Sequence, residues 1–184
     1  DKEVLSIKAS RLSYNTNRAN DVDVVLDLMI HDLDNVNCLL SEELNVVSAV
    51  GGSFHSSNLD YATAIFKTQS GIVCDITASK VSQTKHRSLQ ISCSNCFITV
   101  DFLRKEIELN RHAQGSYVSE SSEVKYKQEQ LVERVFVPNV EPLMAEHTDF
   151  ANAILNDTPV RVSIQDGIDA LRLANEVQLQ CKAN

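Results

Sequence analysis

The alternation of hydrophobic and polar positions predicts one strand, one helix, a long series of strands and two closing helices. Residues 2–12 alternate with period two, which is typical of a strand. One side of this strand carries Leu5, Ile7 and Ala9, and the other carries Val4, Ser6 and Lys8. A polar loop over residues 13–20 follows it.

A helix is predicted from Asp21 or Asp23, each a suitable N-cap, to about Leu40. At about 100° per residue its apolar side chains fall on one arc, made of Val25, Leu26, Met29, Leu33, Val36 and Leu40. The opposite side carries a polar stripe made of Asp27, His31, Asp34 and Cys38. We therefore expect this helix to pack through one face and to present the polar stripe on the other.

After the helix the period changes to two, which predicts a series of strands. The expected strands cover residues 45–55, 61–68, 72–81, 88–93, 97–102, 105–109, 123–128 and 131–137. A hairpin turn at Gln69-Ser70-Gly71 joins two of them, and the polar, serine-rich residues 111–122 are expected to form a loop. Short connections favour a mostly antiparallel sheet.

Two helices are predicted to close the chain. The first starts at Glu141-Pro142 and has an apolar face of Leu143, His147, Phe150 and Ile154. Ser163 and Asp166 resemble a capping box for the second, whose apolar face is Ile168, Leu171, Ala174 and Val177. The order of elements predicts an α+β fold for residues 1–184 as a single domain, a large, mostly antiparallel open sheet with helices packed on one face.

Composition and charge exclude several function classes. No apolar run approaches the ~20 residues of a membrane span. A net charge of -8 argues against a nucleic-acid partner, because binding phosphates needs a basic patch. Five cysteines, an odd number, indicate reduced thiols and a cytoplasmic location.

Two short motifs have structural explanations that we prefer to functional ones. Cys93-Ser94-Asn95-Cys96 is expected to be a hairpin turn; the alternatives are a zinc site, which lacks a second pair of soft ligands, and a redox dithiol. Gly51-Gly52 is expected to mark a strand bulge more than a phosphate-binding loop. The sequence contains no G-x-G-x-x-G pattern.

The polar stripe leaves two alternatives open. Asp27 and His31 can be a solvated i,i+4 pair, worth a few tenths of a kcal/mol. They can also be a catalytic pair in which Asp27 orients and charges an imidazole that moves a proton. No third ligand indicates a metal site, and the remaining histidines, His55, His86, His112 and His147, have no partner at ligand spacing.

Three segments together resemble one enzyme family, that of glucose–fructose oxidoreductase, inositol dehydrogenase and MocA. Residues 21–36, DVDVVLDLMIHDLDNV, resemble its D-x-x-x-H-x-x-D helix. Residues 62–92 are similar to its paired strands with a glycine turn and a basic residue before the next strand. Residues 141–177 are similar to its two closing helices. The segment VDVVLDLMIHD resembles the nucleotide-sugar branch of the family, which includes UDP-N-acetylglucosamine 3-dehydrogenases.

The resemblance implies a C-terminal domain whose N-terminal Rossmann domain, with NAD or NADP, is absent from this chain. It implies that His31 is the base that takes a hydroxyl proton, that Asp27 is the acid beside it, and that Asp34 is structural. It also implies substrate contacts in the loop before the helix, for which the candidates are Arg18, Asn17 and Tyr14. Two departures are Met29, and Cys93 with Cys96, where many relatives have glycine.

The expected function is therefore the substrate-binding and catalytic domain of an NAD(P)-dependent dehydrogenase acting on a sugar or nucleotide sugar. The alternative is a non-catalytic binding or assembly module of the same fold. We expect no cofactor in this fragment, which alone would be inactive. We also expect a homo-oligomer formed through the open sheet face, because Val73, Asp75, Thr77 and Ser79 alternate there with apolar residues.

Overall fold

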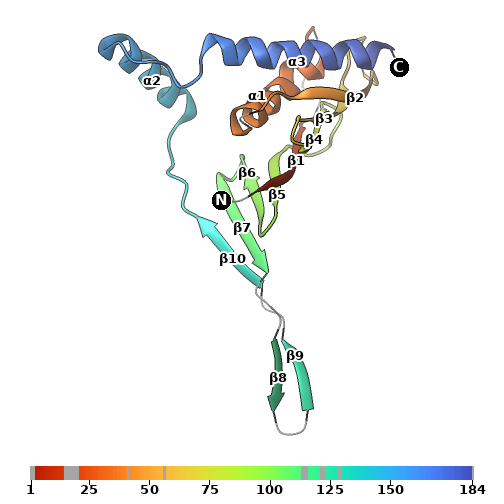
Figure 1. Ribbon diagram of the computed structural model, residues 1–184. Helices are drawn as coiled ribbons and strands as arrows, with labels where there is room; N and C mark the ends of the chain where they lie inside the picture. Colours follow the sequence, from red (N-terminus) through yellow and green to blue (C-terminus); the bar gives the residue numbers. More distant parts are fainter. Residues whose placement is uncertain are drawn as a thin grey trace.

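An eight-stranded sheet forms the centre of the molecule, in a computed structural model (Figure 1). The structure describes residues 3–14, 21–40, 42–55, 57–112, 116–120, 123–127 and 130–183, and only the backbone between 112 and 130. The strand order is β10-β7-β6-β5-β1-β4-β3-β2. β1 and β4 run parallel, and the other neighbours run antiparallel.

The strands of this sheet are β1 (Val4–Leu12), β2 (Asn45–Gly52), β3 (Tyr61–Lys67), β4 (Val73–Ser79), β5 (His86–Cys93), β6 (Phe97–Asp101), β7 (Glu106–His112) and β10 (Gln130–Val135). The helical segments are η1 (Val25–Met29), α1 (Ile30–Leu39), α2 (Pro142–Asn156) and α3 (Ile164–Ala183). This arrangement confirms the predicted α+β class. Within the described part of the chain, no helix has the length and hydropathy to cross a membrane.

The core lies between one face of the sheet and the helices η1, α1 and α3. The sheet contributes alternate residues to it, among them Ile7, Ala9, Cys74, Ile76 and Ala78. The predicted arc of the first helix packs against them, with Val25, Met29, Leu33 and Val36 fully buried. The strand and helix periods thus place the same apolar residues inside that the sequence indicated.

The start of the first helix differs from the prediction because Val25–Met29 winds as a π-helix before the α-helix begins. Of the two candidate caps, Asp23 is the one that caps the N-terminus of the helix. Its Oδ1 accepts hydrogen bonds from the N–H groups of Val25 and Leu26, both at 3.0 Å. Its backbone carbonyl accepts from Asp27 N–H at 3.0 Å.

Bulges change two details of the strands. β1 shifts register between Val4 and Ser6, so Val4 packs against the core while Leu5, which the alternation grouped with Ile7, is exposed. β2 has its bulge at Val46/Ser48, so the bulge predicted at Gly51-Gly52 is in the wrong place. Gly51 pairs regularly with Ala62, and a Cβ there would lie 2.9 Å from the Tyr61 carbonyl oxygen and 3.2 Å from Cys181 Sγ. Glycine is required by this close packing.

The predicted loop over residues 111–122 is wrong in part. β8 (Ser116–Glu120) pairs with β9 (Glu123–Lys127) in a separate two-stranded sheet, which Figure 1 shows apart from the main one. Main-chain hydrogen bonds form this pair, so a serine-rich composition does not prevent it. Both predicted turns are confirmed. Gly71 adopts a positive φ of 99° between β3 and β4, and Cys93 N–H donates to the Cys96 carbonyl at 2.9 Å between β5 and β6.

The two closing helices are confirmed, but their predicted apolar faces need correction. α2 lies away from the sheet (Figure 1), and Ala153 is its one buried residue, so Leu143, Phe150 and Ile154 are exposed. α3 packs through Ala170, Leu173, Ala174, Val177 and Cys181, which leaves the predicted Ile168 and Leu171 partly in solvent. Both sets in α3 have helical spacing, and only the packing against α1 and β2 chooses between them.

Candidate functional site

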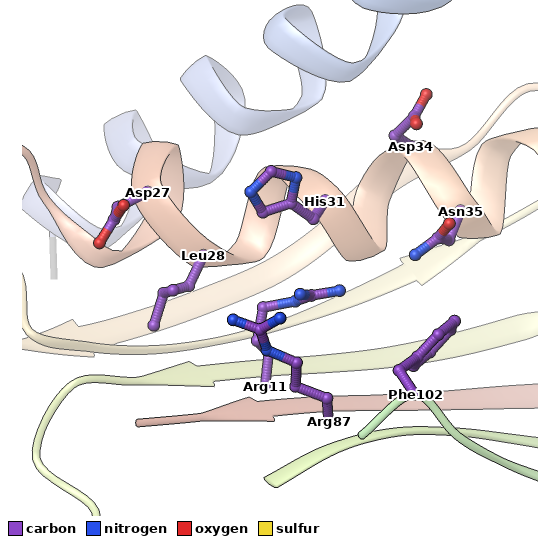
Figure 2. A pocket seen from close by; sticks show the side chains of 8 residues that line it. All are labelled: Arg11, Asp27, Leu28, His31, Asp34, Asn35, Arg87 and Phe102. Carbon is purple, nitrogen blue, oxygen red and sulfur yellow. The ribbon is translucent and has the colours of Figure 1, made fainter. Parts of the chain in front are cut away.

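A pocket of about 470 Å³ lies where the first helix crosses the ends of three strands (Figure 2). The helix contributes Asp27, Leu28, His31, Asp34 and Asn35, and the sheet side contributes Arg11, Arg87 and Phe102. Arg11 lies near the end of β1 and Arg87 near the start of β5, and these two residues are direct partners in the β1–β5 ladder. Phe102 follows β6, and its N–H donates to the Arg87 carbonyl at 3.0 Å.

The wall of the pocket contains a buried ion pair. Arg11 Nη2 lies 2.7 Å from Asp32 Oδ1, and Arg11 Nε lies 2.9 Å from Asp32 Oδ2, so the guanidinium binds the carboxylate with two parallel hydrogen bonds. The two side chains are only 8% and 2% exposed. The pair therefore fixes the position of β1 relative to α1 directly beside His31.

His31 presents an exposed imidazole to the pocket. Desolvation by the surrounding protein lowers the pKa of His31 from 6.5, and the positive charge of Arg11 lowers it further. Asp32 raises this pKa, Arg87 lowers it, and Asp27 raises it with the smallest effect of the five. The net lowering keeps the imidazole neutral at neutral pH, which is the form that can accept a proton.

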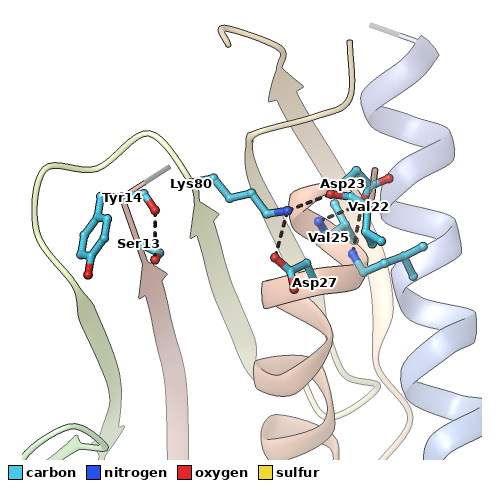
Figure 3. Close-up of polar contacts among 8 residues, drawn as sticks. Ser13, Tyr14, Val22, Asp23, Val25, Asp27 and Lys80 are labelled. Atoms are coloured by element: carbon cyan, nitrogen blue, oxygen red, sulfur yellow. Dashed lines mark hydrogen bonds and ion pairs between the residues drawn. The ribbon is translucent and has the colours of Figure 1, made fainter. Parts of the chain in front are cut away.

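Asp27 is held by a lysine instead of by His31. Lys80 Nζ lies 2.9 Å from Asp27 Oδ2 and donates to the Val22 carbonyl at 2.7 Å (Figure 3). Between Asp27 and His31, both of which the structure describes, there is no direct hydrogen bond. Asp27 thus acts on the imidazole through its charge, while Lys80, just after β4, anchors the π-helical turn that carries it.

Asp34, at the third position of the motif, is half-buried at the edge of the pocket. Desolvation raises the pKa of the Asp34 carboxyl, the negative charge of Asp166 raises it further, and His31 lowers it. Figure 2 shows the Asp34 side chain directed away from the two arginines. Burial and the neighbouring acid thus both favour its protonated form.

Of the three candidate substrate contacts, the structure describes only Tyr14. Tyr14 is 53% exposed on the segment after β1 and is not among the residues that line the pocket. Ser13 Oγ donates a hydrogen bond to the Tyr14 carbonyl at 3.4 Å (Figure 3). Asn17 and Arg18 lie outside the described residues.

Comparison with protein families gives a direct match to this architecture. The model of the GFO/IDH/MocA C-terminal domain matches residues 6–99, about half of the chain, from β1 through most of β6. The chain belongs to the Gfo/Idh/MocA family. The matched region contains every residue that lines the pocket except Phe102.

Individual members of the Gfo/Idh/MocA family extend the likeness over the rest of the chain. A UDP-N-acetylglucosamine 3-dehydrogenase from Acidithiobacillus ferrooxidans is 32% identical over 177 residues, which cover 96% of this chain and 54% of that protein. The solved structure of UDP-N-acetylglucosamine 3-dehydrogenase GnnA from the same organism matches at a TM-score of 0.86 and 30% identity, covering 98% of this chain and 56% of that one. The chain spans about half the length of these relatives.

A more distant solved structure supports the fold alone. A levoglucosan dehydrogenase, solved in complex with NADH, matches at a TM-score of 0.75 and 14% identity, covering 98% of this chain and 57% of that one. The family resemblance inferred from residues 21–36, 62–92 and 141–177 is therefore confirmed.

Three charged residues of this Gfo/Idh/MocA site were not predicted from the sequence. Arg11 lies on the Ile7/Ala9 side of β1, and Asp32 lies on the apolar arc between Met29 and Val36. A single charge on an otherwise apolar face indicates a buried partner, so this signal was present in the sequence. Arg87 had no comparable signal, because its place opposite Arg11 depends on the sheet order.

Proposed function

We propose that this chain is the substrate-binding, catalytic part of an NAD(P)-dependent dehydrogenase that oxidises a hydroxyl of a sugar or nucleotide sugar. The observation that carries the proposal is the exposed imidazole of His31, which lines the pocket beside Arg11, Arg87 and Asp27 at the motif position of the family's base. The lowered pKa of His31 agrees with that role. Support for a nucleotide sugar comes from the relatives, which act on UDP-N-acetylglucosamine and are 30% and 32% identical to this chain.

The chemistry assigned to this chain is the movement of one proton. Oxidation of a secondary alcohol to a ketone removes a proton from oxygen and a hydride from carbon. His31 takes the hydroxyl proton and becomes an imidazolium. Desolvation, Arg11 and Arg87 keep the ring neutral before the reaction, and Asp32 and Asp27 stabilise the cation that forms. Burial and the four charges thus give a base that is unprotonated at rest and has two acids to stabilise it after the transfer.

The nicotinamide dinucleotide would supply the hydride acceptor. Of the described glycines, Gly51 and Gly52 are paired within the β2–β3 ladder, so they form no phosphate-binding loop. We therefore assign dinucleotide binding to the part of the whole protein that corresponds to the other half of the relatives, and not to this chain. Arg18, Asn17 and Tyr14 stay as proposed substrate contacts.

The test uses the whole protein that includes this chain. With UDP-N-acetylglucosamine and NAD or NADP, we expect reduced cofactor to form at 340 nm, and we expect kcat in His31→Gln to fall by roughly 100- to 10,000-fold. His147→Gln, a change at an exposed position of α2, is the matched control and should keep full activity. The acid limb of the kcat/KM profile, which reports the free protein, should have its midpoint below pH 6.5, because the rate falls as pH drops through the lowered pKa of His31.

Full turnover in His31→Gln would exclude His31 as the base. Absence of turnover with every sugar tested, together with retained sugar binding, would favour the alternative of a non-catalytic binding module. The isolated chain should show no saturable micromolar binding of NADH or NADPH by calorimetry beyond that of inorganic diphosphate; such binding would overturn the assignment of the dinucleotide to the rest of the protein.

A further inference from the structure

Two arginines meet across neighbouring strands in the wall of the pocket. Arg11 of β1 and Arg87 of β5 are direct partners in the antiparallel ladder, and both line the pocket, so their side chains share one face of the sheet. Figure 2 shows both side chains extending from the sheet towards the helix that carries His31. Like charges directly opposite one another destabilise a sheet unless other groups compensate them.

The protein compensates one of these arginines and not the other. Asp32 binds Arg11 through two hydrogen bonds of 2.7 and 2.9 Å. Among the residues that the structure describes, no carboxylate forms an ion pair with Arg87. This is notable in a chain with a net charge of -8, in which acids outnumber bases.

The other acids of the pocket form no ion pair with Arg87 either. Asp27 is paired with Lys80 at 2.9 Å. Asp34 points away from the arginines (Figure 2), and burial and Asp166 raise the pKa of its carboxyl. The pocket therefore combines a general base with one guanidinium that lacks a counter-charge from the described protein.

We propose that Arg87 binds the phosphate or diphosphate of the substrate, so that the pocket selects a phosphorylated sugar derivative over a neutral sugar. A guanidinium donates two parallel hydrogen bonds to a phosphate. Because Asp32 binds Arg11, Arg87 is the arginine of the pair that is left to bind an anion. Phe102 adds an apolar wall next to Arg87 against which a sugar or base can pack. The inference rests on the proposed function for the identity of this pocket and names the charged part of its substrate.

Binding to the 184-residue chain tests the proposal without any turnover. Inorganic diphosphate, UDP and neutral N-acetylglucosamine are titrated at constant ionic strength by calorimetry and by NMR of the His31 ring. We expect saturable binding of diphosphate and UDP, weakened roughly 10- to 100-fold in Arg87→Gln. Arg87→Lys, which keeps the charge and loses the two-pronged donor, should give an intermediate loss. Bound anion should raise the pKa of His31, because it neutralises a charge that lowers it.

Lys85→Gln is the matched control, since it removes the same charge from an exposed position two residues away. It should leave anion binding unchanged. Equal binding in Arg87→Gln and the parent chain, or an equal loss in Lys85→Gln, would overturn the proposal. In the whole protein Arg87→Gln should raise KM for the phosphorylated substrate more than it lowers kcat, whereas failure of the proposed function would appear as absent turnover with anion binding intact.

Discussion

Asp32 carries a charge at a helix position that is otherwise apolar. It lies between Met29 and Val36 on the buried arc, and its side chain is only 2% exposed. The contribution of such a buried ion pair to the free energy of unfolding depends on both partners, because burying one charge without the other costs several kcal/mol. Arg11 therefore accounts for an acid that the helix pattern alone does not explain.

We predict that Asp32→Leu lowers the free energy of unfolding by about 3–5 kcal/mol, since it leaves the Arg11 guanidinium buried without a counter-charge. The double variant Arg11→Met/Asp32→Leu should recover most of that loss, because neither charge is then buried. Urea denaturation followed by circular dichroism measures both. Glu106→Gln, at an exposed position, serves as the control. A double variant as unstable as the single one would show that the pair stabilises the fold by more than mutual compensation.

At the scale of elements, several contacts hold the N-terminal turn of the first helix. The π-helical turn Val25–Met29 is held from three sides: Asp23 caps it, Lys80 binds Asp27, and Gln178 of α3 donates to the Asp23 carboxylate. Short π-helical segments inside longer helices are frequent at functional sites. These contacts set the orientation of the turn that precedes His31.

We expect Asp23→Ala to lower the free energy of unfolding by about 1–2 kcal/mol, because two N–H groups lose their acceptor and α3 loses a contact. Asp21→Ala tests the other candidate cap, which is exposed, and should change stability by less than about 0.5 kcal/mol. Thermal unfolding of the two variants under identical conditions decides between them. A larger effect at Asp21 than at Asp23 would mean that the helix begins earlier than the structure has it.

At the scale of the whole molecule, none of the described helices covers one of the two faces of the sheet. Its central residues are Tyr61, Thr63, Ile65 and Thr77, and Thr63 and Thr77 hydrogen-bond each other at 2.8 Å. Lys80 and Arg87 do not hydrate this face, because Lys80 pairs with Asp27 of the first helix and Arg87 lines the pocket on the helical side. By strand register this face also carries Asp75, Asp101 and Glu108. Asp75 Oδ2 lies 3.6 Å from Lys8 Nζ, while the buried Asp75 Oδ1 has no hydrogen-bond partner among the described residues.

We predict that the chain self-associates through this face, with closed two-fold dimers as the simplest product. Sedimentation equilibrium from low to high micromolar concentration should show a rising mass. Thr77→Lys, which places a charge in the middle of the face, should shift the chain to monomer, and Asn95→Lys in the exposed β5–β6 turn should not. A monomer at every concentration would contradict the prediction and leave assembly to other parts of the whole protein.

The sequence by itself determined the order and type of most elements and the family. Side-chain periodicity follows directly from local backbone geometry, so the arc from Val25 to Leu40 and the alternation in β4 could be predicted without a structure. The turn at Gly71 and the position of His31 on the polar side of its helix follow from equally local signals.

Only the tertiary structure decided which charges meet. Arg11 and Asp32 lie 21 positions apart, and the pairing of Arg11 with Arg87 depends on β5 lying next to β1. The same holds for the ion pair between Lys80 and Asp27. The pKa of His31 is therefore set mainly by desolvation and by Arg11. Strand order and the placement of a helix on a sheet arise from contacts between distant residues, and local periodicity contains no information about them.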